Sequence, residues 1–271
     1  MLKFLKRKIF VRLNKGSFLE PGFLIIGCQK CGTTSLYEYL IQHPNVVAAS
    51  KKEIQFFTSN YDKGYEWYKS HFSRSKDIRE KTDVITGEAT PYYILHPHSP
   101  ARVRQMLPDV KLIVMLRDPV ERAFSHYKHH VKFKVESLPF DEAIKAESKR
   151  LMGELDKMAQ DESYDSYNLQ MFSYLKRGVY IDQLKKWLDY FPKEQFLILQ
   201  SEKFFNDPSS HFAKTLQFLD LPEYQLMSYE KFNASPDSSM DKEIRKYLVD
   251  YFRPYNEKLY ELLGLDFGWQ K

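Results

Sequence analysis

The strongest constraint on the fold is an apolar run that leads directly into a loop rich in glycine and hydroxyl residues. Residues 22–27 read Gly-Phe-Leu-Ile-Ile-Gly, which is typical of a strand buried on both faces of a parallel sheet. Residues 33–41 place their apolar side chains on one helical face, and this helix is expected to end before Pro44. A buried strand, a glycine-containing loop and a helix in this order predict an α/β fold.

Further strands and helices alternate along the rest of the chain. Strands are predicted at residues 46–49, 83–87, 111–116 and 195–199. Helices are predicted at residues 119–134, 209–219 and 240–263, with Asp118 and Gly264 as caps. Residues 139–190 also have helical character, with a helix predicted at residues 179–190. This alternation predicts a central parallel β-sheet flanked by helices on both faces. Such sheets bind ligands beyond the carboxyl ends of their strands.

The composition excludes several other classes of protein. Of the 271 residues, 43% are hydrophobic and 28% are charged, so a disordered chain is excluded. No apolar run is long enough for a transmembrane helix. Cys28 and Cys31 are the only cysteines, which excludes a disulfide-stapled scaffold. No repeat or linker interrupts the chain, so residues 20–271 are predicted to form a single domain.

A basic leader, residues 1–19, precedes this domain and carries Lys and Arg but no acid before Glu20. One interpretation is a frayed segment packed loosely on the domain. The other is that residues 1–18 form a basic amphipathic helix in weak contact with an anionic membrane surface. The longest apolar run in the leader is Ile9 to Val11, too short for a secretory signal peptide. A cytoplasmic location is therefore expected.

The loop at residues 27–35 has the character of a phosphate cradle. Its glycines let successive backbone N–H groups point at one anion, and the following helix adds the partial positive charge of its N-terminus. The candidate binding residues are Gln29, Lys30, Cys31, Gly32, Thr33, Thr34 and Ser35. The loop departs from the Walker pattern, because Thr33 follows Gly32 and the lysine comes two residues before that glycine. The position that would hold magnesium is therefore missing, and no metal is predicted.

The loop has two alternative interpretations. Cys28 and Cys31 form a Cys-x-x-Cys pair that could serve redox chemistry, but this leaves the run of hydroxyl residues unexplained. The glycines could also form a purely structural turn. A structural zinc site is excluded, because no further cysteine is present to complete it.

A second candidate phosphate site follows the strand at residues 111–116. Arg117 comes directly after that strand, and Ser125 lies about two helical turns further on, so its hydroxyl can face the guanidinium. A guanidinium and a hydroxyl together suit a second, separate phosphate. In the alternative interpretation, Arg117 pairs with Asp118 or Glu121 and Ser125 has no role.

Together these two segments resemble the phosphate-binding motifs of sulfotransferases that use 3′-phosphoadenosine 5′-phosphosulfate (PAPS). Residues 27–36 resemble the 5′-phosphosulfate loop, and residues 116–127 resemble the 3′-phosphate motif, with Arg117 and Ser125 at the binding positions. Five further segments resemble the N- and 3-O-sulfating heparan sulfate sulfotransferases, at residues 52–57, 88–93, 177–180, 187–192 and 266–269. The resemblance begins near residue 20 and implies a P-loop-like α/β fold that binds PAPS without a metal.

The same resemblance implies roles for individual residues. In-line sulfuryl transfer needs positive charge near the transferring group and a base for the proton of the acceptor. The resemblance gives the first role to Lys30 and the second to Glu53, with Glu88 as the second candidate for the base. Glu88 and Arg177 are also candidate substrate contacts. In the alternative interpretation, Glu53 is an exposed acid paired with a lysine.

The sequence departs from the family at positions that bear on the acceptor. Ala89 stands where the 3-O-sulfating relatives have lysine, and Gln55 stands where some relatives have histidine. A carbohydrate acceptor is expected, with a lipid, small metabolite or tyrosine as alternatives, and O- and N-sulfation both stay open. The late nucleotide-binding loop of the family corresponds to residues 231–239, through Lys231, Asn233 and Ser235.

Two other classes of function are consistent with parts of the sequence. A nucleotide kinase or NTPase on a modified P-loop would turn over ATP with magnesium. A non-catalytic module would bind a nucleotide or a nucleic acid, the latter with a steep salt dependence, and would not need Lys30. No nucleic-acid-binding motif is present. The sequence therefore predicts a metal-independent sulfotransferase that acts on a glycan or small molecule and has no nucleic-acid partner.

Overall fold

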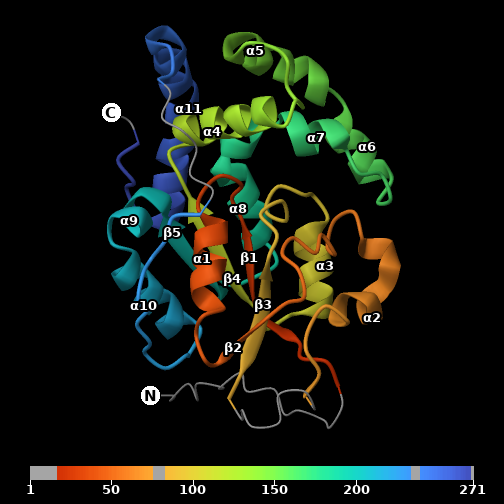
Figure 1. Cartoon of the computed structure of the whole chain (residues 1–271). Helices are drawn as coiled ribbons and strands as arrows, with labels where there is room; N and C mark the ends of the chain where they lie inside the picture. The colour runs from red at the N-terminus through yellow and green to blue at the C-terminus, as the bar shows by residue number, and fades with distance from the viewer. Residues whose placement is uncertain (1–16, 76–82, 233–238, 270–271) are drawn as a thin grey trace.

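A five-stranded parallel sheet forms the centre of the protein. The computed structural model describes residues 17–75, 83–232 and 239–269. The strand order is β2-β3-β1-β4-β5, and every pairing is parallel (Figure 1). The strands are β1 (Pro21–Gly27), β2 (Val46–Ala48), β3 (Ile85–Ala89), β4 (Lys111–Leu116) and β5 (Phe196–Gln200). All five predicted strands are therefore confirmed, with small shifts at some of their ends.

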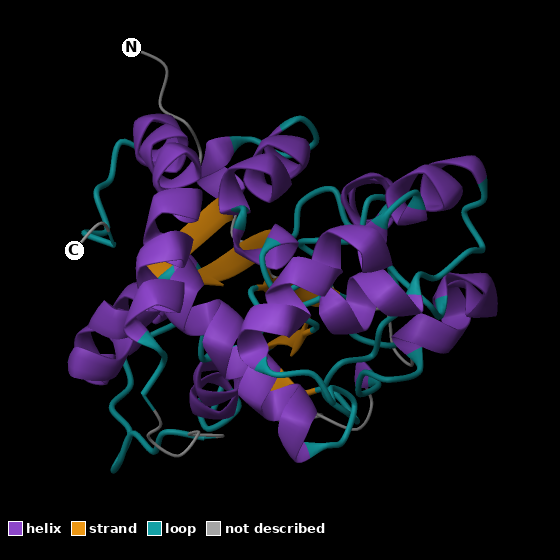
Figure 2. Ribbon diagram, turned by 90° about the horizontal axis from the view of Figure 1, so that it is seen from above, coloured by secondary structure: helices purple, strands orange, loops and turns teal. Residues whose placement is uncertain are grey.

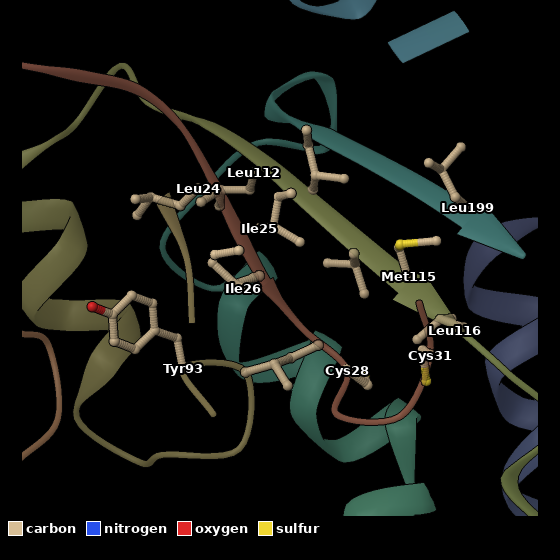
Figure 3. Packing of buried hydrophobic residues seen from close by; sticks show 14 of the residues in the cluster. Leu24, Ile25, Ile26, Cys28, Cys31, Tyr93, Leu112, Met115, Leu116 and Leu199 are labelled. Atoms are coloured by element: carbon tan, nitrogen blue, oxygen red, sulfur yellow. The ribbon is translucent and has the colours of Figure 1, made fainter. Parts of the chain in front are cut away.

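Both faces of the sheet are covered. Residues 23–26 of β1 and 112–116 of β4 are fully buried, as expected when helices pack on both faces of a parallel sheet. Figure 2 shows helices on both sides of the strands. Figure 3 shows side chains of β1, β4 and β5, among them Ile25, Leu112 and Leu199, in the core between them. The predicted α/β architecture is confirmed.

The five individually predicted helices are present. They are α1 (Thr33–Leu40), α4 (Pro119–Lys132), α8 (Tyr180–Leu188), α10 (Pro208–Phe218) and α11 (Lys242–Leu263). The structure adds α2 (Gly64–Lys69), α3 (Ser99–Met106), α5 (Phe140–Leu151), α6 (Glu154–Gln160), α7 (Tyr167–Phe172) and α9 (Ser201–Asn206). Of these, α2, α3 and α9 lie where the sequence analysis places no helix, whereas α5, α6 and α7 lie in a region with helical character.

The predicted caps are present. The Asp118 carboxylate accepts a hydrogen bond of 2.9 Å from the Val120 N–H at the start of α4, and Pro119 occupies the first helical position. Burial raises the pKa of Asp118 to about 6. At the other end of the chain, Gly264 ends α11 in the left-handed conformation with φ of 65°. Local sequence signals therefore define these two helix ends.

The order of the strands places the functional loops together. The chain leaves β1 through α1 to build β2 and β3 on one side, and it later places β4 and β5 on the other side. Leu24 of β1 pairs with Glu88 of β3 and with Leu112 of β4, so these three strands end at the same edge. Figure 1 shows α4, α5 and α7 gathered beyond that edge. This is where an open α/β sheet binds its ligand.

Most of the predicted leader lies outside the described residues, which begin at Ser17. Its contact with an anionic membrane, the boundary at residue 20 and the cytoplasmic location stay predictions. In the described parts of the chain, every helix is too short or too polar to cross a bilayer.

Candidate active site

The loop after β1 folds back on itself before α1 begins. The Cys28 N–H donates to the Met115 carbonyl at 2.8 Å, and the Cys31 N–H donates to the Cys28 carbonyl at 3.2 Å. Lys30 and Gly32 have left-handed backbones, with φ of 68° and 94°. The N-cap position of α1 is occupied by Gly32, which has no side chain. The hydroxyls of Thr33, Thr34 and Ser35 therefore do not cap this helix. The first turn of an α-helix lacks backbone acceptors for its N–H groups, which here are directed toward the loop.

This loop lines a cavity of about 390 Å³ that we call the donor cavity. Most of the predicted binding residues lie in its wall: Gln29, Lys30, Gly32, Thr33, Thr34, Glu53, Arg117 and Ser125. Lys52, Lys128 and Lys231 add further cations from three other segments. A wall with this many ammonium and guanidinium groups suits a ligand that carries several negative charges.

Burial and the charges around Lys30 lower the pKa of its ammonium group. Burial lowers the pKa of Lys30 below its ordinary value, and the nearby charges of Arg117, Lys128 and Lys132 lower it further. Cations held this close repel one another, and an anion bound between them offsets that repulsion. A polyanionic ligand in the donor cavity would therefore be stabilised by Lys30, and would in turn favour its charged form.

Arg117 and Ser125 lie on the same cavity, as predicted. The Arg117 guanidinium donates to the Lys30 carbonyl at 3.3 Å and lies 3.9 Å from the Glu121 carboxylate. Glu121 also forms an ion pair with Arg245. Both interpretations of Arg117 are thus partly realised, because it has a carboxylate partner and still lines the cavity beside Ser125. Its bond to the Lys30 carbonyl ties the β4 end to the loop after β1.

Glu53 lies at the junction of the donor cavity and a second cavity. Its carboxylate is half-exposed and lies 3.9 Å from the Lys52 ammonium, which donates a hydrogen bond to Thr34. The second cavity has a volume of about 280 Å³ and shares Gln29, Glu53, Pro91 and His129 with the first. The two cavities therefore form one continuous cleft, and we call the second part the acceptor cavity.

Arg177 reaches the wall of the acceptor cavity, although it is almost fully buried. Its guanidinium donates to the Gln170 carbonyl at 2.8 Å and to the Ser173 hydroxyl at 3.1 Å. It also lies over the ring of Tyr92, which lines the same cavity. Arg177 thus builds this wall from behind through its hydrogen bonds to the neighbouring helix α7 and the residues after it.

Three predicted site residues are not brought to the cleft. Glu88 is fully buried, and its carboxylate accepts hydrogen bonds from Tyr68 and Tyr93. The sequence analysis placed Glu88 beyond the end of a strand, but it lies within β3 and its side chain points into the interior. Its role as a substrate contact or alternative base is therefore corrected. The other two residues, Cys31 and Ser35, are also fully buried. The Ser35 hydroxyl accepts a hydrogen bond of 3.1 Å from the Phe232 N–H.

Several residues of the cleft were missed. Lys128 and His129 follow Ser125 by three and four residues on α4, so helical spacing alone could have identified them. Phe205 comes from α9, a helix that the sequence analysis does not predict, and its ring packs over the loop beside Gly32. Lys231 lines the donor cavity with its ammonium 4.6 Å from the Phe205 ring centroid. The other two positions aligned with the late nucleotide-binding loop, 233 and 235, lie outside the described residues.

In the described ranges, no three His, Cys, Asp or Glu side chains are grouped to hold a metal ion. The two cysteines of the loop are not bonded to each other and are buried. The Cys31 thiol lies 3.9 Å from the Tyr180 hydroxyl. These two thiols therefore belong to the core beneath the loop (Figure 3).

Comparison with known proteins identifies the family. Residues 20–253 match the family model named Sulfotransferase domain. The chain is 31% identical to the membrane-associated sulfotransferase kil1 of Dictyostelium discoideum, over 92% of this chain and 66% of that protein. It is also 31% identical to human heparan sulfate glucosamine 3-O-sulfotransferase 3A1, over 95% of this chain and 64% of that protein. The chain thus spans slightly less than two thirds of the length of these two relatives.

A solved structure has the same fold over nearly its whole length. The crystal structure of a sulfotransferase from Alicyclobacillus acidocaldarius superposes with a TM-score of 0.71 at 30% identity, covering 93% of this chain and 99% of that one. The resemblance to sulfotransferases, including the heparan sulfate 3-O-sulfating branch, is confirmed, as is the P-loop-like α/β fold. The chain belongs to the sulfotransferase family.

Proposed function

We propose that this protein transfers a sulfuryl group from PAPS to a hydroxyl or amine of a carbohydrate acceptor. The observation that carries the proposal is the continuous cleft, in which Lys30 lies on the donor side and Glu53 lies where the donor and acceptor cavities meet. A transfer reaction needs two substrates to meet at one point, with positive charge on one side of it and a base on the other.

The residues of the donor cavity fit a nucleotide that carries two separate anionic groups. Lys30, Thr33 and Thr34 would hold the phosphosulfate together with the backbone N–H groups at the start of α1. Arg117 and Ser125, on the other side of the loop, would hold a 3′-phosphate. Lys128 and Lys231 would add to the positive charge of the cavity. Gln29 lines both cavities and would lie beside the transferring group.

Lys30 and Glu53 would divide the chemistry between them. The bond from sulfur to the acceptor oxygen or nitrogen forms while the bond from sulfur to the phosphate oxygen breaks, and 3′-phosphoadenosine 5′-phosphate leaves. Lys30 would stabilise the negative charge that develops on that leaving oxygen. Glu53 would accept the proton of the acceptor. Neither task requires a metal ion.

The carbohydrate acceptor is supported by the heparan sulfate glucosamine 3-O-sulfotransferases among the relatives. The acceptor cavity has aromatic and polar side chains, including Tyr92, Phe133, His129 and Gln170, and such a mixture suits the faces and hydroxyls of a sugar.

The proposal is tested by supplying the purified chain with radiolabelled PAPS and a panel of glycans, phenols and small alcohols, with and without EDTA. We expect labelled sulfate on at least one carbohydrate, with release of one equivalent of 3′-phosphoadenosine 5′-phosphate, and no loss of rate in EDTA. Turnover of ATP that depends on magnesium, without binding of PAPS, would contradict the proposal and favour a kinase. Transfer to phenols alone would retain the reaction and correct the acceptor.

A further inference from the structure

The turn that carries Glu53 has an unusual backbone. Glu53 and Gln55 both have left-handed conformations, with φ of 55° and 59°. Residues with a side chain rarely adopt this conformation, and they keep it only where surrounding contacts hold it. The turn also lies at the junction of the two cavities. The contacts that hold it therefore determine where the Glu53 carboxylate points.

Several contacts anchor the backbone of this turn to β3 and the residues just after it, including one between the Ile54 backbone and the Glu88 carboxyl group. The Glu53 N–H donates to the Ala89 carbonyl at 3.2 Å. The Phe56 N–H donates to the Tyr93 hydroxyl at 3.0 Å. The Phe56 ring is buried and stacks on Tyr68 with ring centroids 4.5 Å apart. One end of the turn is thus held by a backbone carbonyl and the other by a buried tyrosine hydroxyl.

The Tyr93 hydroxyl is in turn held by Glu88. It donates to one carboxylate oxygen of Glu88 at 2.8 Å, while Tyr68 donates to the same oxygen at 3.0 Å and Thr90 donates to the other at 2.6 Å. A backbone N–H can only donate, so the Tyr93 oxygen accepts from Phe56 while the Tyr93 hydroxyl proton is donated to Glu88. Burial raises the pKa of Glu88, and these donors act against that rise.

We propose that Glu88 is a positioning residue for Glu53, acting directly on the Ile54 backbone and through the Tyr93 hydroxyl on the Phe56 backbone. Its carboxylate fixes the direction of the Tyr93 hydroxyl, that hydroxyl fixes one end of the turn, and the turn directs Glu53 into the cleft. This gives a role to a fully buried acid that lies next to Ala89, whose carbonyl accepts a hydrogen bond from the Glu53 N–H. The inference rests on the proposed role of Glu53 as that base.

Four single variants separate positioning from general stability. Tyr93→Phe removes the hydroxyl that joins Glu88 to the turn, whereas Tyr68→Phe removes another hydroxyl on the same Glu88 oxygen that has no bond to the turn. Glu88→Gln keeps the size of the side chain. Thr86→Val removes a buried hydrogen bond elsewhere in β3, from Thr86 to the Val47 carbonyl at 2.7 Å. Melting temperature, kcat, acceptor KM and the Kd for 3′-phosphoadenosine 5′-phosphate are measured for each.

We expect Tyr93→Phe and Glu88→Gln to lower kcat by about 10- to 100-fold, as small misplacements of a catalytic group do. Nucleotide affinity should be unchanged in both variants. The loss of kcat in Tyr68→Phe should be several-fold smaller than in Tyr93→Phe. Thr86→Val should leave kcat unchanged while still lowering the melting temperature. In a Glu53→Gln background, Tyr93→Phe should cause no further loss of kcat, because its effect passes through Glu53.

The outcomes distinguish this inference from the proposed function. If Glu53→Gln lowers kcat but Tyr93→Phe does not, or if Tyr93→Phe acts equally in both backgrounds, the positioning role is wrong and the base is retained. Equal loss of kcat in Tyr93→Phe and Tyr68→Phe would also overturn it. Normal kcat in Glu53→Gln would overturn the role of Glu53 itself, and the positioning role with it.

Discussion

Lys30 and Glu53 lie in one cleft, but their surroundings differ. Lys30 belongs to the loop after β1, its carbonyl accepts a hydrogen bond from Arg117, and other cations lower the pKa of its ammonium. Glu53 is half-exposed beside Lys52 at the entrance to the acceptor cavity. The first surroundings suit a group that stabilises an anion, and the second suit a group that takes a proton from an incoming hydroxyl or amine.

Substitution of these two residues should therefore give different kinetic results. Lys30→Ala removes a contact to the donor as well as the charge on the leaving oxygen, so both nucleotide affinity and the single-turnover rate should fall. Glu53→Gln keeps the shape of the side chain and removes only the base. Nucleotide affinity should hold, while the single-turnover rate should fall by about 10²–10⁴-fold.

These effects are measured by calorimetry with 3′-phosphoadenosine 5′-phosphate and by rapid quench with radiolabelled PAPS. Wild-type protein in the same buffers is the reference, and melting temperatures show whether each variant is folded. A Glu53→Gln variant that loses nucleotide affinity as strongly as Lys30→Ala would place Glu53 among the donor contacts and contradict its role as the base.

Single residues were predictable where a strand or helix signal fixed their place. Lys30, Arg117 and Ser125 follow strands whose apolar runs are unmistakable, so their arrival at one edge of the sheet could be predicted. Glu88 was misplaced because its strand ends two residues later than the pattern indicated. That shift turns an expected cleft residue into a buried one. The hydrogen bonds that hold it there come from the nearby Thr90 and Tyr93 and from the more distant Tyr68, and no sequence pattern predicts that they converge on it.

At the scale of elements, the loop after β1 is held in place by α9. A Cβ on Gly32 would lie 2.8 Å from the Phe205 ring, closer than real side chains approach, and Gly32 also has φ of 94°. Only glycine satisfies both conditions without a shift of the loop or of the ring. The start of α1, where the donor would bind, therefore depends on a ring from a helix far along the sequence.

We predict that Gly32→Ala weakens nucleotide binding as well as lowering stability. The strained backbone should cost about 1–3 kcal/mol in the free energy of unfolding, and the collision with Phe205 should displace the loop and weaken binding of 3′-phosphoadenosine 5′-phosphate by tenfold or more, on the order of the penalty for a misplaced site. Chemical denaturation and calorimetry measure the two effects.

Gly153→Ala is a matched control for this prediction. Gly153 has φ of 72° at the start of α6, but nothing lies within 4 Å of an added Cβ. It should show the backbone cost alone and bind the nucleotide normally. Normal nucleotide binding in Gly32→Ala, with a similar loss of stability in both variants, would contradict the role assigned to Phe205.

Elements were predictable in proportion to their periodicity. The five strands and the long helices α1, α4, α8, α10 and α11 have clear apolar patterns, and capping signals at Asp118 and Gly264 define two of their ends. The helix α9 has only six residues and begins directly after β5. Such a short helix is stabilised by its packing, here through the buried ring of Phe204. The sequence does not show what that ring packs against, so the helix could not be predicted.

At the scale of the whole molecule, function depends on the order of the strands. Because β1 lies between β3 and β4, the loop after β1 meets Arg117 on one side and the Glu53 turn on the other. Alternating strands and helices predicted a parallel sheet, but they do not specify which strands are neighbours. The continuity of the two cavities could therefore not be predicted, although the residues that line the donor cavity largely could.

The central claim is that this cleft holds a 3′-phosphorylated adenine nucleotide, and calorimetry with two nucleotides tests it most directly. Arg117 and Ser125 should make 3′-phosphoadenosine 5′-phosphate bind more tightly than AMP by about 1.5–3 kcal/mol, or about 10- to 100-fold in Kd. Ser125→Ala should reduce that difference while leaving the affinity for AMP nearly unchanged. Equal affinities of the wild-type protein for the two nucleotides would contradict the 3′-phosphate site and, with it, the proposed donor.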